Sequence, residues 1–143
     1  MNSFNLKKKT FNFDRSNFIH MKNNSLFDEY EIKDKLGEGA YGCVYKVQHK
    51  FTNFLRAVKA IKRKHVDSNF INEIKILKTV DHPNIIKLFD CYYDNNYYYM
   101  IEEYCSGGDL FDYLHRQKYF SEKKASIILK QLLSAVNHLH KKK

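Results

Sequence analysis

Two charged residues stand in otherwise apolar segments of this chain. Lys59 lies within Leu55 to Ile61, a run of small and β-branched residues that predicts a strand. Glu73 lies beside Ile74 on the apolar side of a segment with helical spacing. Because burying a lone charge costs free energy, these opposite charges predict a mutual ion pair. The plainer alternative is a lysine on an edge strand and a glutamate on the surface.

A glycine pattern precedes this lysine. Gly37, Gly39 and Gly42 are spaced as G-x-G-x-x-G, and Val44 follows them. Glycine lets the backbone approach phosphate closely. In a dinucleotide-binding fold a helix would begin at these glycines, but the segment Cys43 to His49 alternates like a strand. The pattern therefore favours a glycine-rich hairpin that covers a triphosphate, and a plain glycine-rich hairpin is the alternative.

The remaining pattern predicts the elements that would position these residues. Tight turns join most of the strands, which favours an antiparallel sheet with one inserted helix, an α+β fold. Asp67 or Ser68 is the expected N-cap of the inserted helix, and Ser121 caps a long amphipathic helix. The predicted strands cover residues 30–36, 43–49, 55–61, 85–93 and 97–104, and the predicted helices cover 68–79, 109–116 and 121–140.

Composition narrows the class of protein. The chain has 143 residues with 43% hydrophobic content, which suits one folded domain. Three scattered cysteines favour a reducing compartment, so we expect a cytoplasmic or nuclear location. No apolar run is long enough for a membrane span. His138 and His140 have no third ligand near them, so no metal site is predicted there.

The net charge of +9 raises the question of nucleic-acid binding. The charge is spread along the chain and no nucleic-acid motif accompanies it, so we do not expect nucleic acid as a partner. Residues 1–26 are polar and rich in Asn and Lys, and they predict a flexible basic extension ahead of a domain at 27–143.

Taken together, the motifs resemble the front half of a eukaryotic-type serine/threonine protein kinase. The resemblance rests on Gly37 to Val44, Ala57-Val58-Lys59, Glu73 and the segments "EIKILKTVDHPNIIKLFDCYYD" and "EEYCSGGDLFDYL". It is strongest for the calcium/calmodulin-dependent and calcium-dependent kinases. The resemblance implies an N-lobe over about residues 30–105, with a five-stranded antiparallel sheet and one helix, and the start of a helical C-lobe over 106–143.

The resemblance also implies an ATP site. Lys59 would hold the α- and β-phosphates while Glu73 orients it. Backbone groups of Glu103 and Cys105 would bond the adenine edge, and Asp109 would lie near the ribose or a basic substrate residue. The full set implied to contact ATP is Leu36, Gly37, Glu38, Gly39, Ala40, Tyr41, Gly42, Val44, Ala57, Lys59, Glu103, Cys105 and Asp109. Leu77 and Leu88 match the hydrophobic stack between helix and sheet, and ordinary core packing describes them equally well.

Two features depart from the kinase pattern. Glu102 falls behind the adenine, where the family usually carries an apolar residue or Thr, and a buried carboxylate there needs Lys59 as a partner or a proton. The sequence also lacks the His-Arg-Asp loop, its asparagine and the Mg²⁺-binding Asp-Phe-Gly. We therefore expect no catalytic residue and no Mg²⁺ ligand in these residues, with Lys59 and Glu73 as a supporting ion pair.

Two functions remain open. The leading one is the ATP-binding part of a kinase that transfers the γ-phosphate of ATP to protein hydroxyls, with ATP and a protein as partners and Mg²⁺ as cofactor. A regulatory domain beyond the C-terminus is compatible with this resemblance. The alternative is a kinase-like module that binds nucleotide or a protein partner without catalytic activity.

Overall fold

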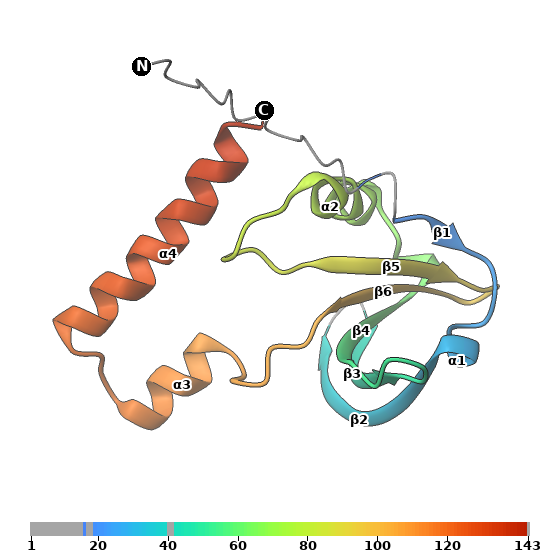
Figure 1. Ribbon diagram of the computed structural model, residues 1–143, viewed down its shortest axis with the longest axis horizontal. Helices are drawn as coiled ribbons and strands as arrows, with labels where there is room; N and C mark the ends of the chain where they lie inside the picture. The colour runs from blue at the N-terminus through green and yellow to red at the C-terminus, as the bar shows by residue number, and fades with distance from the viewer. Residues whose placement is uncertain (1–15, 17–18, 40–41, 143) are drawn as a thin grey trace, which may run out of the picture.

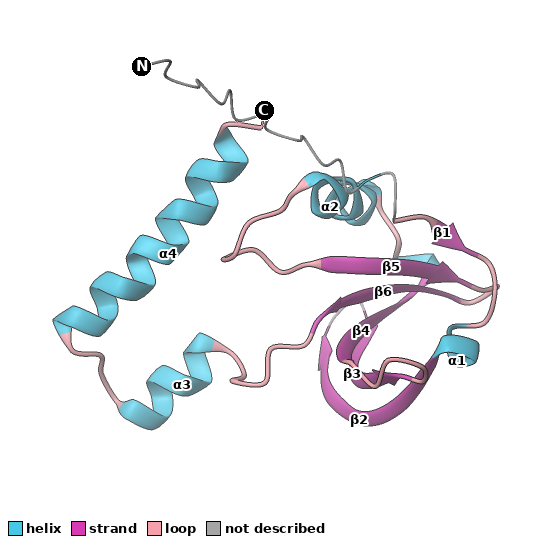
Figure 2. Ribbon diagram, in the orientation of Figure 1, coloured by secondary structure: helices cyan, strands magenta, loops and turns pink. Residues whose placement is uncertain are grey.

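The computed structural model describes residues 16, 19–39 and 42–142. A twisted sheet forms the body of the protein, one helix packs on one of its faces, and two further helices extend from it (Figure 1). The sheet comprises β1 (Met21–Lys22), β2 (Tyr30–Gly39), β3 (Gly42–His49), β4 (Leu55–Lys62), β5 (Leu88–Tyr93) and β6 (Tyr97–Glu103). The predicted α+β class is confirmed, and Figure 2 shows the strands gathered in one sheet with the helices outside it.

The sheet has the strand order β1-β5-β6-β4-β3-β2. The five long strands pair antiparallel, as predicted, because short turns join most of them. The two-residue strand β1 adds a sixth strand, parallel to β5, with Met21 opposite Cys91 and Lys22 opposite Tyr92. A strand of two residues is too short to produce an alternating hydrophobic pattern, so the sequence did not predict it.

The prediction of a flexible extension up to residue 26 is wrong for its last part. Ile19 and Leu26 are each only 3% exposed, and they pack in two different core clusters. Lys22 Nζ donates to the Glu29 carboxylate and to the Tyr92 hydroxyl, and it also pairs with Asp90 at 3.2 Å. Through these contacts Ile19, before β1, and Leu26, after it, are packed into the core although no apolar period surrounds either residue. The rest of the extension, residues 1–15, 17 and 18, lies outside the described residues.

The N-terminal segment then forms the short helix α1 (Leu26–Glu29), where Ser25 is the N-cap and accepts from the Phe27 amide. Two strand ends also differ from prediction by more than one residue. β2 continues to Gly39, because its ladder with β3 closes only at the pair Gly39 and Gly42. β5 begins later than predicted, at Leu88, since a turn in which the Ile85 amide donates to the His82 carbonyl precedes it.

The inserted helix α2 (Ser68–Thr79) begins where it was predicted to begin. Asp67 is the N-cap, and its carboxylate accepts from the Phe70 amide at 2.9 Å. The short 3₁₀ turn η2 (Arg63–His65) connects β4 to this helix. The helix buries Phe70, Ile74 and Leu77 against the sheet, where they join Ile61, Leu88, Cys91 and Met100 in one cluster. A second cluster on the opposite face holds Leu26, Tyr30, Val47, Val58, Tyr92 and Ile101.

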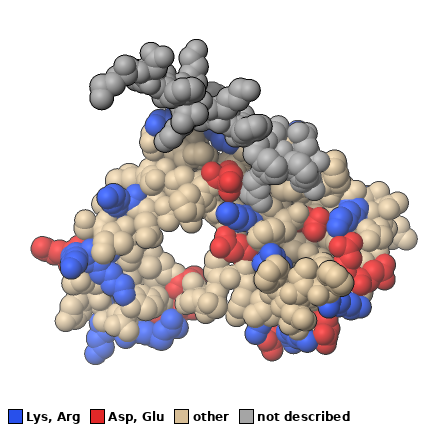
Figure 3. Space-filling model, viewed as in Figure 1, with Lys and Arg blue, Asp and Glu red and all other residues tan. Residues whose placement is uncertain are grey.

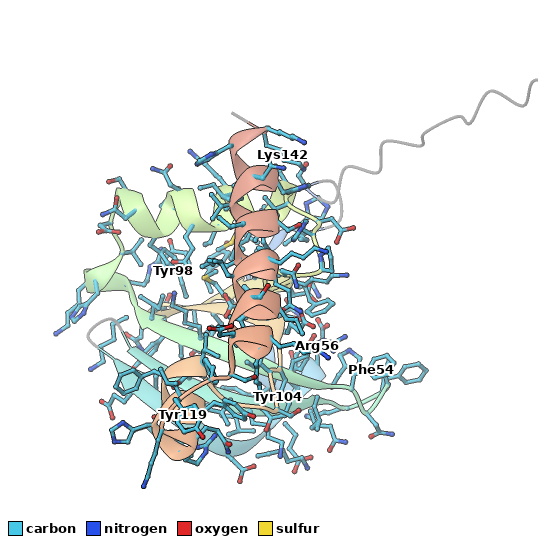
Figure 4. All side chains as sticks on the ribbon, turned by 90° about the vertical axis from the view of Figure 1, so that its left-hand side faces the viewer. Phe54, Arg56, Tyr98, Tyr104, Tyr119 and Lys142 are labelled. Carbon is cyan, nitrogen blue, oxygen red and sulfur yellow. The ribbon has the colours of Figure 1, made fainter. Side chains whose placement is uncertain are left out.

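Helices α3 (Leu110–Gln117) and α4 (Glu122–His140) follow the sheet and are capped by Asp109 and Ser121. Figure 3 shows an opening through the molecule between these helices and the sheet. The C-terminal end of α4 returns to the sheet domain: His82 Nε2 lies 3.0 Å from Ser134 Oγ, and Lys142, labelled in Figure 4, donates to the Thr79 carbonyl. Of the α4 residues only Ala135 is buried.

Candidate functional site

The structure brings the two predicted charges together. Lys59 Nζ lies 2.9 Å from Glu73 Oε1 and 3.2 Å from Oε2, so one ammonium group bonds both carboxylate oxygens. The lysine comes from the middle of β4 and the glutamate from the second turn of α2. The side chain of Lys59 is 29% exposed to solvent and that of Glu73 is 42% exposed, so a ligand can reach the pair.

Strand register places further candidate residues on the face that carries Lys59. Directly opposed residues in a sheet project to the same face. One row across the strands runs Gly37, Val44, Lys59 and Met100. The neighbouring row runs Lys46, Ala57, Glu102 and Leu88. Gly37, Val44, Ala57 and Lys59 therefore share one face with the α2 cluster.

The three glycines of the hairpin differ in what surrounds them. A Cβ on Gly42 would lie 1.9 Å from the Ala60 carbonyl oxygen, so glycine is required there by the close approach of β4. A Cβ on Gly37 or Gly39 would meet nothing within 4 Å. Space for a ligand therefore remains at the first two glycines, and Gly42 serves the strand pairing. Ala40 and Tyr41, also predicted to contact ATP, lie outside the described residues.

Two further predicted ATP contacts, Glu38 and Leu36, are exposed on β2. Glu38 lies opposite Cys43, in the row that faces away from Lys59, and it forms an exposed ion pair with Lys35 at 2.6 Å. Leu36 is 45% exposed beside a β-bulge between Lys35 and Gly37. An exposed apolar side chain at that place is available to cover a flat ring.

At the end of β6 the chain leaves the sheet through an irregular segment. The Glu103 amide donates to the Lys87 carbonyl at 2.9 Å, and the Cys105 carbonyl accepts from Gly108 in a turn. Gly108 has a φ of 74°, a value that favours glycine. Asp109 is the N-cap of α3 and accepts from the Asp112 amide at 2.7 Å, so one of its oxygens already serves the helix.

Glu102 is the only buried charged residue in the described part of the chain, with 8% exposure. Burial raises the pKa of its carboxyl from 4.5 to about 6, while the positive charge of Lys59 lowers this pKa and the charge of Glu73 raises it. Lys59 hydrogen-bonds Glu73, and within residues 16, 19–39 and 42–142 no group donates a hydrogen bond to the Glu102 carboxylate. Of the two carboxylates expected to compete for Lys59, Glu73 is therefore the one that binds it in this structure.

Cavities occur on both faces of the sheet. Lys59 and Glu73 line a cavity of about 150 Å³ together with Ile61 and Phe70. A larger cavity, of about 470 Å³, lies on the opposite face, between α1 and the strands, and Tyr45, Val58 and Ala60 line its floor. Sequence reasoning missed this second cavity because Leu26 and Phe27, which close one side of it, were assigned to the boundary of the extension. Its lining also includes Glu38, Gly39 and Gly42 of the glycine-rich hairpin, but Lys59 and Glu73 line only the smaller cavity.

The described residues contain no cluster of three or more His, Cys, Asp or Glu side chains that is arranged to hold a metal ion. Within the same part of the chain, no helix is both long enough and apolar enough to cross a lipid bilayer. His138 lies against His82, with ring centroids 5.1 Å apart, and its Nε2 is buried without a hydrogen bond.

Comparison with known proteins agrees with this geometry. The protein kinase domain family matches residues 30–143. Calcium-dependent protein kinase 3 of Plasmodium yoelii yoelii is 40% identical over 137 residues, which cover 94% of this chain and 26% of the relative. Calcium-dependent protein kinase 5 of Plasmodium falciparum (isolate 3D7) is 44% identical, covering 91% and 24%. Calcium-dependent protein kinase 4 of Plasmodium berghei (strain Anka) is 38% identical, covering 98% and 27%.

The chain therefore spans roughly a quarter of the length of these relatives. The family match covers every strand from β2 onward and all of α2, α3 and α4. It includes both members of the Lys59–Glu73 pair and the whole glycine-rich hairpin. This chain belongs to the protein kinase domain family and is homologous to the calcium-dependent protein kinases.

Proposed function

We propose that this chain is the ATP-binding part of a serine/threonine protein kinase. The observation that carries the proposal is the ion pair of Lys59 with Glu73, on the sheet face to which the strand register also assigns the open glycine Gly37. A cation held beside glycine backbone is the arrangement that suits the phosphates of a nucleoside triphosphate.

In the proposed complex each group has one task. Lys59 donates to the α- and β-phosphate oxygens, and Glu73 limits the rotation of the lysine side chain. Leu36, Val44 and Ala57 cover the base, and the backbone of Glu103 and Cys105 bonds its edge. Because the ammonium group is already aimed, less side-chain entropy is lost when the phosphates bind. Divalent metal, when bound with the nucleotide, would neutralise phosphate charge.

Transfer of the γ-phosphate to a protein hydroxyl requires more than this site. A catalytic aspartate must orient the hydroxyl, and metal ligands must stabilise the developing charge. The 143 residues contain neither a His-Arg-Asp nor an Asp-Phe-Gly triplet. We therefore propose that these residues by themselves bind nucleotide and do not transfer phosphate.

Nucleotide binding by the purified chain tests the site. Fluorescence titration with an ATP analogue labelled on the ribose compares the chain with Lys59→Met, which is expected to weaken binding by at least about tenfold because it removes the cation that faces the phosphates. Lys33→Met is the matched control, since Lys33 forms an exposed ion pair with Glu31 on β2. Equal binding by Lys59→Met and the unsubstituted chain would refute the proposed site.

A kinase-like module that binds nucleotide or a protein partner without catalytic activity is the second candidate. Sequencing the transcript past the codon for Lys143 separates the two. Continuation into a His-Arg-Asp loop supports the kinase, whereas a stop codon directly after Lys143 supports the binding module.

A further inference from the structure

Glu102 occupies an unusual place for an acid. Its cross-strand neighbours are Ala57 on β4 and Leu88 on β5, both of which are buried. Glu103, which follows it directly, carries the backbone that the proposed function assigns to the adenine edge. The Glu102 side chain therefore projects from the same strand end, on the face that holds Ala57 and Lys59.

The carboxylate lacks a donor in the described residues, although it is nearly enclosed. The charged and titratable groups around it are Lys59 on β4, Glu73 on α2 and Cys91 on β5. Lys59 is engaged by both oxygens of Glu73, and Cys91 is a buried thiol whose pKa burial raises to about 11. Glu102 is 8% exposed and its oxygens are not among the fully enclosed polar atoms that lack a partner, so a ligand can still reach them. Because the carboxylate is largely desolvated, a ligand that supplies an N–H group gains from meeting it.

We propose that the Glu102 side chain selects a 6-amino purine over a 6-oxo purine by accepting a hydrogen bond from the exocyclic amino group. This inference rests on the proposed ATP site and names the source of its base specificity. The amino group has two hydrogens, so backbone at the adenine edge and the Glu102 carboxylate can each accept one. A 6-oxo purine places an acceptor oxygen against the same carboxylate, where two acceptors repel and neither is satisfied.

The protonation of Glu102 makes this discrimination dependent on pH. An ionised carboxylate only accepts, whereas a protonated carboxyl group also donates and can bond the 6-oxo group. Because burial raises the pKa of Glu102 to about 6, the carboxylate predominates at pH 8 and the protonated form at pH 5. The preference for ATP over GTP should therefore be strong at pH 8 and weak at pH 5.

The experiment measures Kd for ATP and GTP, each labelled on the ribose, with the full 143-residue chain at pH 8 and pH 5. The readout is the ratio of Kd for GTP to Kd for ATP, because the phosphates of the two nucleotides titrate alike and cancel. Glu102→Gln keeps the shape of the side chain and offers both a donor and an acceptor, and Glu102→Met keeps its length without either. Glu31→Gln, which removes one exposed negative charge on β2, is the control.

The ratio at pH 8 is expected to fall by about tenfold in Glu102→Met and Glu102→Gln and to stay unchanged in Glu31→Gln. The ratio for the unsubstituted chain should fall towards that of the variants at pH 5. If ATP binds and the ratio is the same with and without Glu102, the inference is overturned and the proposed ATP site stands. If a chain with native circular dichroism binds neither nucleotide, the proposed site and this inference both fail.

Discussion

Lys59 and Glu73 join β4 to α2 through a single ammonium group that bonds both carboxylate oxygens, at 2.9 and 3.2 Å. The link is mechanical as well as electrostatic, because α2 packs on the same sheet face through Phe70, Ile74 and Leu77. Helix packing determines where the glutamate lies, and the glutamate determines where the lysine points.

Replacing Glu73 separates these roles. Both side chains are partly exposed, so Glu73→Gln should lower the free energy of unfolding by no more than about 1 kcal/mol. Nucleotide binding should weaken by about fivefold, because the lysine loses its orienting charge. Urea unfolding and fluorescence titration measure the two effects. A loss of stability without any change in nucleotide affinity would show that Glu73 has only a structural role.

The three glycines of the hairpin should differ in how much stability is lost when each is replaced by alanine. Gly42→Ala forces a methyl group against the Ala60 carbonyl and should destabilise the chain by about 1–3 kcal/mol. Gly37→Ala and Gly39→Ala meet no atom within 4 Å and should change stability by no more than about 0.5 kcal/mol. Urea denaturation followed by circular dichroism compares the three. Equal losses at all three positions would contradict the packing described for β3 and β4.

The buried carboxyl of Glu102 should make stability fall as pH rises. Its pKa is about 6 in the folded state and 4.5 in the absence of burial, so the folded state binds the proton more tightly. This contribution is fully present below pH 4.5 and is lost as the pH rises through 6, for a total of about 2 kcal/mol.

Glu102→Gln removes the titrating group while keeping the shape of the side chain. Relative to the unsubstituted chain, this variant should therefore gain about 2 kcal/mol of stability between pH 4.5 and pH 7.5. Urea unfolding across that pH range measures the difference between the two proteins. Parallel pH profiles for the two would rule out a raised pKa at Glu102.

The apolar face of α4 should promote self-association. Leu129, Leu132 and Leu133 lie on one side of this helix and are each more than half exposed. Contiguous exposed apolar surface favours association, so Leu132→Lys and Leu133→Lys should reduce light scattering without lowering the melting temperature. Ala135→Lys is the contrasting variant, because Ala135 is buried and its replacement should destabilise the chain. Unchanged scattering in both leucine variants would contradict the prediction.

Local patterns in the sequence were enough to predict most of the strands and helices. Alternating and helical periods located the five long strands and the three principal helices, because each buries one face and its apolar residues repeat accordingly. The N-caps Asp67 and Ser121 could be predicted because the side chain of each bonds an amide only three residues away. Lys59 and Glu73 were paired in advance because each is a charge inside an apolar pattern.

Only the tertiary structure decided what depends on distant contacts. Met21–Lys22 became a strand because β5 offers an unpaired edge and because Glu29, Asp90 and Tyr92 surround the Lys22 ammonium. Gly42 differs from Gly37 because β4, and not its own turn, crowds it. Among the described residues Lys59 bonds Glu73, which α2 carries, and not Glu102. Periodicity reports which face of an element is buried, but the partner that meets that face is set by packing between segments far apart in the chain.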